Sequence, residues 1–249
     1  MTEYHNPIIY LDTTESTNLF AQEFLKNHEP LHGTVISAGQ QLQGRGQRGN
    51  QWLSVPGLNL TFSIILFPSK FNVSRHFELN MVFSLGICDY LSAKRVDQFQ
   101  VKWPNDILVN GNKIAGILLE NTIRGELIHT VIAGIGININ QVDFIGNYTI
   151  EPTSLKRILG ITIELKEALP EVLNFIWKRY DQMINQEVEL LRKDYHALLY
   201  KLNEPCRFTI DNLTWTGLIR GVNQDGQLLI ENENGEIKQH PITGIKMLV

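Results

Sequence analysis

The stretch GRGQRGNQW, residues 44–52, decides between two folds for this chain. Its three glycines have the Gly-x-Gly-x-x-Gly spacing of a Rossmann phosphate-binding turn, which requires a helix directly after the glycines and an acidic residue about 20 positions further on. Here Pro56 and Gly57 follow, which prevent a helix of useful length, and the first acidic residue is Glu78. The sequence therefore excludes a Rossmann fold and leaves residues 44–52 as a long glycine-rich loop.

Two arginines and a tryptophan equip this loop to bind an anion. Glycines let the backbone approach a ligand closely, and the guanidinium groups of Arg45 and Arg48 offer forked donors to a phosphate or carboxylate. The indole of Trp52, which ends the loop, can cover a purine. A flexible surface loop with solvated charges is the alternative, and the loop alone does not decide between the two.

The segments around the loop alternate between helical and extended patterns. Apolar residues recur at helical spacing in residues 16–27 and 74–95. Strand-like apolar runs occupy residues 32–39, 57–67, 99–109, 113–120 and 128–139. Asn110-Gly111 is a strong signal for a tight turn between two of these runs. This order predicts an α+β fold in which helices pack on a mixed sheet.

The last third of the chain changes character twice. Residues 153–201 read as helical, with Gly160 ending one short helix and Pro170 placed to begin another. From Cys206 onward the pattern is one of short strands and turns, with hairpin signals at Asp225-Gly226 and Asn234-Gly235. The sequence predicts a large domain over residues 1–200 and a small, SH3-like β-barrel over residues 201–249.

The composition limits the function. A formal charge of −4 gives no overall basic field, so neither nucleic acid nor an anionic membrane is expected as a partner. Cys88 and Cys206 lie far apart and the seven histidines are scattered, which argues against a zinc site or a disulfide framework and predicts both cysteines in the core. The start MTEYHNPIIY lacks a basic segment before an apolar one, and no apolar run approaches the roughly 20 residues of a membrane span. These features predict a soluble, cytoplasmic protein.

A second cluster of polar residues lies in KWPNDILVNGNKIAGILLE, residues 102–120. Asp106 can hold a Mg²⁺ ion on the phosphates of a nucleotide, because Mg²⁺ prefers one or two carboxylates together with phosphate oxygens. Lys113 supplies a charge that can stabilise the transition state of adenylyl transfer, and Gly116 leaves room for a ligand. The alternatives are a packed strand end at Trp103-Pro104 and a solvated hairpin lysine.

A third piece is GIGININ, residues 134–140. Gly134 and Gly136 leave room beside a strand, and Asn138 offers an amide edge suited to adenine. Taken alone, this segment is a weak signal.

Together these pieces resemble the catalytic and C-terminal parts of the biotin protein ligases, also called biotin–(acetyl-CoA-carboxylase) ligases. The motifs ESTN, QQLQGRGQRGNQW, KWPNDI, KIAGILLE and GIGINI occur in the order and approximate spacing of that family and cover nearly the whole chain. The resemblance implies that biotin and ATP give enzyme-bound biotinyl-5'-AMP and pyrophosphate. The biotinyl group then passes to one lysine of a biotin carboxyl carrier protein.

The resemblance also implies roles for single residues. It assigns catalysis to Lys113, Arg45 and Asp106. It assigns biotin binding to Ser16, Thr17, Asn18, Gln41, Arg45, Gly46, Gln47, Lys113 and Gly116. It assigns nucleotide binding to Arg48, Trp52, Asn105 and Asn138. ATP and Mg²⁺ are then the co-substrate and metal, with Asp106 the metal ligand, and neither zinc nor haem is expected.

One departure from the family and three further expectations follow from the resemblance. Where the family loop often reads Gly-Arg-Gly-Arg, this chain has Gln47 in place of the second arginine, which weakens the expected grip on the intermediate. Because the chain starts almost at ESTN, a DNA-binding N-terminal domain and DNA binding are not expected. The family resemblance alone predicts a homodimer in which sheets pair edge to edge. The alternatives are a lipoate or octanoate ligase and a non-catalytic biotin- or nucleotide-binding module.

Overall fold

The computed structural model describes residues 7–210 and 213–248, so the first six residues, used above to argue against a leader segment, lie outside it. Its main feature is an eight-stranded sheet in the order β1-β2-β3-β8-β7-β6-β5, with β4 paired to β8. The strands are β1 (Ile8–Thr14), β2 (Thr34–Gln41), β3 (Leu60–Leu66), β4 (Phe71–Asn72), β5 (Phe99–Lys102), β6 (Asp106–Val109), β7 (Asn112–Arg124) and β8 (Leu127–Ile137). Since β1 and β2 are parallel and the other neighbours antiparallel, the predicted mixed sheet is confirmed.

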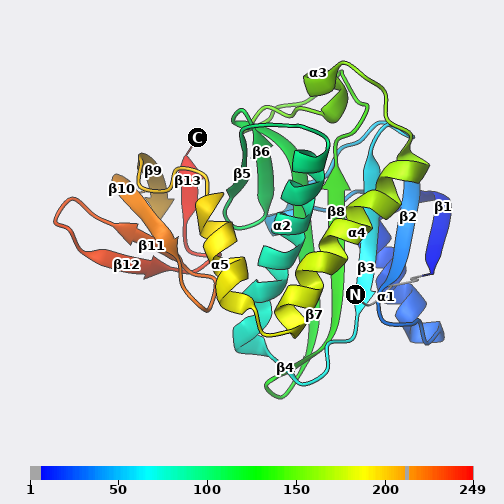
Figure 1. Cartoon of the computed structure of the whole chain (residues 1–249), viewed down its shortest axis with the longest axis horizontal. Coiled ribbons are helices and arrows are strands. Elements are labelled where there is room, and N and C mark those ends of the chain that lie inside the picture. The colour runs from blue at the N-terminus through cyan, green and yellow to red at the C-terminus, as the bar shows by residue number, and fades with distance from the viewer. Residues whose placement is uncertain (1–6, 211–212, 249) are drawn as a thin grey trace.

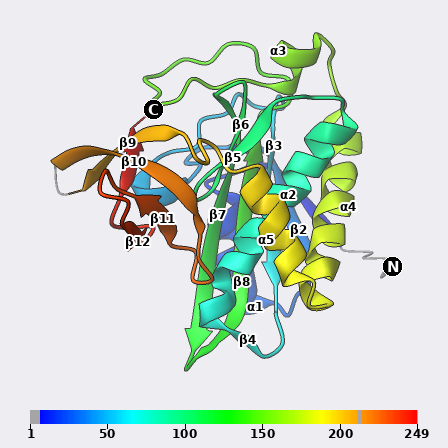
Figure 2. The same cartoon turned by 60° about the vertical axis from the view of Figure 1, so that its left-hand side comes forward.

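Helices cover both faces of this sheet. They are α1 (Thr17–Asn27), α2 (His76–Ala93), α3 (Leu155–Leu159), α4 (Leu165–Ile184) and α5 (Val188–Ala197). Helices α2, α4 and α5 lie together over one face, as Figures 1 and 2 show. Helix α1 packs on the opposite face, where Ala21 meets Ile36, Ile65 and Ile132 in a separate small cluster.

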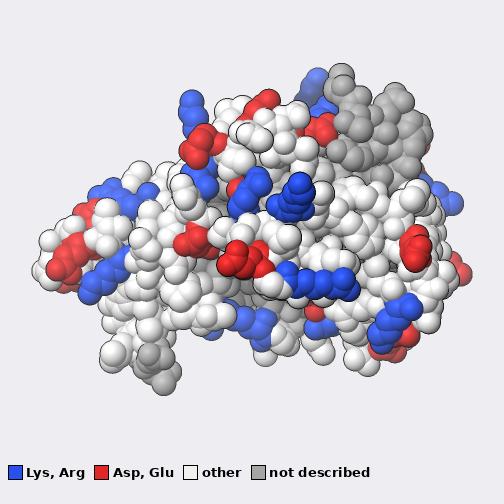
Figure 3. All heavy atoms as spheres, turned by 90° about the horizontal axis from the view of Figure 1, so that it is seen from below, with Lys and Arg blue, Asp and Glu red and all other residues white. Residues whose placement is uncertain are grey.

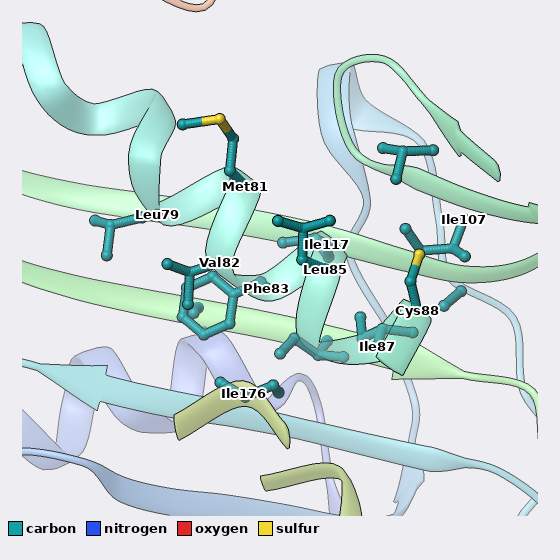
Figure 4. Packing of buried hydrophobic residues seen from close by; sticks show 14 of the residues in the cluster. Leu79, Met81, Val82, Phe83, Leu85, Ile87, Cys88, Ile107, Ile117 and Ile176 are labelled. Atoms are coloured by element: carbon teal, nitrogen blue, oxygen red, sulfur yellow. The ribbon is translucent and has the colours of Figure 1, made fainter. Parts of the chain in front are cut away.

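Helix α2 is the centre of the main core because it packs against α4, α5 and strands β5, β6 and β7. Side chains of α2, including Leu85 and Cys88, form one packed cluster with Ile107 and Ile117 of the sheet and Ile176 of α4 (Figure 4). Burying one such aliphatic side chain contributes about 1.5–3 kcal/mol. As predicted, Cys88 and Cys206 are both free and buried.

The glycine-rich loop joins two strands of the sheet. Strand β2 ends at Gln41, the loop contains only the short 3-10 turn η1 (Gln47–Gly49), and the chain enters β3 at Leu60. A Rossmann turn would require a helix at this place. The prediction that residues 44–52 do not form such a turn is confirmed.

Two local predictions were wrong, both at a proline. The run over residues 99–109 is not one strand: β5 and β6 form an antiparallel hairpin around the cis peptide Trp103-Pro104, because proline has no N–H to donate within a sheet. Pro170 does not begin a helix but lies inside α4. The bond that its missing N–H would make is to Lys166, an exposed residue of the first turn whose carbonyl water can reach.

The C-terminal strands form a separate antiparallel sheet in the order β12-β11-β10-β9-β13. They are β9 (Pro205–Ile210), β10 (Leu213–Val222), β11 (Leu228–Glu231), β12 (Ile237–His240) and β13 (Lys246–Leu248), with turns at both predicted Gly pairs. Over the described residues β12 and β13 are not paired, so the order is open and the expected SH3-like barrel is not confirmed. The division at residues 200 and 201 stays a prediction.

Surface charge is mixed. Lys and Arg are interspersed with Asp and Glu on the face drawn in Figure 3. Within residues 7–210 and 213–248, none of the helices has the length and apolarity needed to cross a membrane.

Candidate active site

One large pocket, of about 650 Å³, opens where the N-terminus of α1, the glycine-rich loop, the β6–β7 hairpin and β13 meet. Residues predicted from distant parts of the sequence converge here. The lining includes Ser16, Thr17, Asn18, Gln41, Arg45, Gly46, Gln47, Arg48, Trp52, Asn105, Asp106, Lys113 and Gly116. Every predicted site residue except Asn138 is therefore brought to one cavity.

The first turn of α1 lines this pocket and is hydrogen-bonded to a side chain of β2. The Thr17 backbone N–H donates to Oε1 of Gln41 at 2.8 Å, which satisfies one of the helix's unpaired donors. Ser63 of β3 donates its hydroxyl to Thr17 Oγ1 at 2.7 Å or to Asn18 Oδ1 at 2.6 Å. Ser16, which precedes the helix, makes no side-chain capping bond. These buried bonds fix the ESTN segment against the sheet.

The glycine-rich loop folds back on itself, and the side chains of its two arginines contact other parts of the chain. The Trp52 N–H donates to the Gly44 carbonyl at 2.9 Å, and the Gly46 N–H donates to the Asn50 carbonyl at 2.7 Å. Arg48 has φ 56, a left-handed conformation that non-glycine residues rarely adopt, and its guanidinium donates to the Ile245 carbonyl at 3.2 Å. Arg45 Nη2 lies 3.1 Å from Glu120 Oε1.

The indole of Trp52 lies over the glycines of β7 and β8. A methyl group at Gly136 would overlap the indole ring, and one at Gly116 would lie 3.2 Å from it. The Lys113 ammonium lies 5.6 Å from the ring centroid, within cation–π range. The indole N–H is buried and finds no acceptor among the described residues. The glycines thus make room for an aromatic side chain that itself faces the ligand cavity.

The charged groups that line the pocket are mainly positive. Asp106 is the one carboxylate among the pocket-lining residues, and its Oδ1 lies 2.6 Å from Lys113 Nζ. Arg48 and Lys102 also line the pocket, and burial lowers the pKa of Lys102 below its ordinary value, with Asp106 opposing that change. A cavity lined by several lysine and arginine groups and one acid suits a polyanionic ligand.

Two predicted nucleotide residues have structural partners. The Asn105 amide donates to the Ile117 carbonyl at 2.8 Å, so it holds the β5–β6 turn as well as facing the pocket. Asn138 is buried outside the lining, where its amide donates to the Thr153 carbonyl at 3.0 Å. Its contact with adenine stays a prediction that its position does not support.

Some pocket residues gave no clear signal in the sequence. Residues 147–150 and the segment Ile245, Lys246 and Met247 line the cavity although no motif marks them. They come from a loop and from β13 with the residue before it, and only the fold brings these segments to the site. Lys102 belongs to the KWPND motif, but sequence reasoning gave it no role.

Comparisons with known proteins agree with this geometry. The model of the Biotin/lipoate A/B protein ligase family matches residues 10–138, and the chain belongs to that family. It is 30% identical to the bifunctional ligase/repressor BirA of Bacillus spizizenii over 92% of this chain and 70% of that protein. It is 28% identical to the biotin–(acetyl-CoA-carboxylase) ligase of Paracoccus denitrificans over 90% of this chain and 94% of that protein. The biotin protein ligase of Aquifex aeolicus, solved in complex with biotin and ATP, superposes with a TM-score of 0.81 at 29% identity, covering 98% of this chain and 99% of that one.

Proposed function

We propose that this protein is a biotin protein ligase that activates biotin with ATP and transfers the biotinyl group to a lysine of a carrier protein. One observation carries the proposal: a single cavity joins the ESTN segment, the glycine-rich loop and Lys113. The likeness to the Aquifex aeolicus ligase, whose structure holds biotin and ATP, supports the choice of substrates.

In the first step, a carboxylate oxygen of biotin attacks the α-phosphorus of ATP. The new bond is the mixed anhydride of biotinyl-5'-AMP, and the bond that breaks releases pyrophosphate. Lys113 and Arg45 stabilise the negative charge on the carboxylate and α-phosphate. Because the cavity already holds both side chains, they need little reorganisation during the reaction. The N-terminal turn of α1 and Gln41 hold the biotin, and Trp52 and Arg48 hold the nucleotide.

Mg²⁺ enters as part of the nucleotide substrate. Asp106 fits such an ion, because Mg²⁺ on phosphates takes only one or two protein carboxylates. This carboxylate pairs with Lys113, so Asp106 would hold the ion beside the Lys113 ammonium, and the ion would neutralise charge on the phosphates.

In the second step, the amine of the acceptor lysine attacks the acyl carbon and AMP leaves. The amine loses a proton as the amide bond forms, and the enzyme needs no covalent nucleophile of its own. We assign the acceptor to a biotin carboxyl carrier protein, recognised as a folded domain. The edge strand β1, whose described neighbour is β2 alone, offers main-chain groups to a partner strand.

The remaining assignments belong to the same proposal. Residues 201–249 act as a small domain of SH3-like type that closes the nucleotide side of the pocket through Arg48 and Ile245. We also propose that the protein forms a homodimer, is located in the cytoplasm and does not bind DNA specifically.

One assay decides among the candidate functions. Purified protein is incubated with ATP, Mg²⁺ and either biotin, lipoate or octanoate, and pyrophosphate release is followed with and without apo carrier domain. Release with biotin alone and labelling of the carrier lysine are expected. Preference for lipoate or octanoate would identify the protein as the other kind of ligase, and ligand binding without pyrophosphate would identify a binding module.

A further inference from the structure

The last residue of the KIAGILLE motif, Glu120 of β7, lies outside the pocket lining but contacts two residues that belong to it. Its Oε1 is 3.1 Å from Arg45 Nη2, and its Oε2 accepts the Asn18 amide at 2.7 Å. The two oxygens of one carboxylate thus hold the glycine-rich loop and the first turn of α1, which approach β7 from different parts of the chain.

The side of the carboxylate that faces α1 is firmly fixed. Asn18 is 2% exposed, and its oxygen can accept from the buried Ser63 hydroxyl at 2.6 Å. A methyl group at Gly134 would overlap the Asn18 amide, so the strand beneath leaves Asn18 little freedom to move. The side that faces the loop is looser, since the Arg45 side chain is 42% exposed. Asn18 therefore holds one oxygen of Glu120 in place, and the other oxygen restrains the more exposed side chain of Arg45.

We propose that Glu120 is a positioning residue that sets Arg45 and Asn18 at a fixed separation across the biotin end of the pocket. The inference rests on the proposed function, in which both residues contact the biotin portion. Without the carboxylate, Asn18 loses an acceptor for its amide, and Arg45 loses its ion-pair partner. An arginine that is already oriented loses less conformational freedom when an acyl phosphate binds. We therefore expect Glu120 to strengthen the binding of biotin and its adenylate rather than the binding of ATP.

Three variants separate the two contacts. Glu120→Gln keeps an acceptor for Asn18 and removes the charge that holds Arg45, whereas Glu120→Ala removes both. Glu231→Gln is the matched control, because Glu231 pairs with Arg220 and has the same 24% side-chain exposure as Glu120, but lies in the C-terminal sheet.

The first readout is independent of enzyme activity. Trypsin cuts after Arg45 and Arg48 when the loop opens, and mass spectrometry locates the cuts. We expect Glu120→Gln and Glu120→Ala to be cut there at least threefold faster than the wild type, with an unchanged melting temperature for Glu120→Gln. The control is expected to match the wild type. Equal cleavage rates for Glu120→Gln and the wild type would overturn the proposal.

The second readout is kinetic. The KM for biotin is expected to rise about threefold to fivefold in Glu120→Gln and at least tenfold in Glu120→Ala, while the KM for ATP changes less than twofold. Faster cleavage with an unchanged KM for biotin would also overturn the positioning role. If the wild type shows no biotin-dependent pyrophosphate release, the proposed function fails, but the trypsin comparison still decides whether Glu120 restrains the loop.

Discussion

Lys113 Nζ and Asp106 Oδ1 lie 2.6 Å apart across the β6–β7 hairpin, so the lysine expected to act on the phosphates and the acid expected to hold Mg²⁺ form an ion pair with each other. The backbone of Lys113 is anchored independently of this pair. Its N–H donates to the Glu151 carbonyl at 2.8 Å, and its carbonyl accepts the Thr153 N–H at 2.9 Å. The side chain can therefore change partner without moving the strand.

We predict that Lys113→Ala slows adenylation about 10²-fold, which corresponds to roughly 3 kcal/mol of lost transition-state stabilisation, and changes biotin affinity much less. Pre-steady-state pyrophosphate release and equilibrium biotin binding measure the two effects separately. Lys166→Ala, at an exposed lysine of α4, is the control. Pyrophosphate release from Lys113→Ala at near wild-type rate would remove this lysine from the mechanism.

The contact between Trp52 and Gly136 gives a prediction about stability. Adding a methyl group at Gly136 forces the indole or the strand to move, and such overpacking typically costs about 1–3 kcal/mol of unfolding free energy. We expect Gly136→Ala to show this loss in urea unfolding, and to show almost none in a Trp52→Ala background, where the clashing ring is absent. The same loss in both backgrounds would mean that the indole does not occupy this place in solution.

A half-buried histidine, His32, predicts how the stability of the folded protein varies with pH. The Phe67 N–H donates to Nδ1 of His32 at 3.1 Å, so this nitrogen must be unprotonated, and burial lowers the pKa of His32 below its ordinary value of 6.5. The folded protein then binds fewer protons at this site than the unfolded chain. The stability that neutral His32 contributes is fully present above about pH 6.5 and is lost as the pH falls through the lowered folded-state pKa.

Urea unfolding between about pH 8 and pH 5 tests this dependence. The wild type is expected to lose stability below pH 6.5 more steeply than His32→Gln, whereas His28→Gln, at an exposed histidine beyond α1, should follow the wild type. Parallel curves for the wild type and His32→Gln would show that His32 does not titrate differently on folding.

More of the candidate site residues than of the residues that pack around them could be predicted from the sequence. Motifs identified Lys113, Arg45 and the ESTN segment because substrate chemistry restricts these residue types and spacings. Asn138 was also chosen by its motif, but β8 ends at Ile137 and the next residue turns its amide to the Thr153 carbonyl. The direction in which a side chain points after a strand ends depends on the packing of the following loop, which has no sequence pattern of its own.

The place of the C-terminal sheet could not be predicted from the sequence. Its turns were marked by Gly pairs, but its docking depends on contacts between residues far apart in the chain, such as the bond from the Trp103 indole N–H to the Gly226 carbonyl at 2.9 Å. The two residues are 123 positions apart, and a tryptophan beside a proline gives no sign of its distant acceptor. The same limit applies to Pro170, since a helix tolerates a proline where the bond it removes can be replaced by water.

The last prediction concerns Gln47, which lines the pocket between two arginines that already have protein partners. Arg45 is paired with Glu120 and Arg48 with the Ile245 carbonyl, so both arginines have protein contacts. A neutral amide bond to the acyl phosphate contributes about 0.5–1.5 kcal/mol, whereas a charge-assisted bond from arginine contributes about 1.5–3 kcal/mol. The difference of about 1 kcal/mol and the planar fork of arginine predict that Gln47→Arg retains biotinyl-5'-AMP roughly fivefold to tenfold longer.

Stopped-flow tryptophan fluorescence, with Trp52 as the reporter, follows release of the preformed intermediate from each protein. Gln43→Arg is the matched control, because Gln43 is an exposed glutamine just before the loop and lies outside the main pocket, so it adds the same charge without reaching the phosphate. Only Gln47→Arg should slow release, and its effect should shrink at high salt as the added charge is screened. An off-rate unchanged within twofold would mean that Arg45 and Arg48 leave their protein partners and already saturate the phosphate oxygens. Glutamine at position 47 would then not weaken the binding of the intermediate.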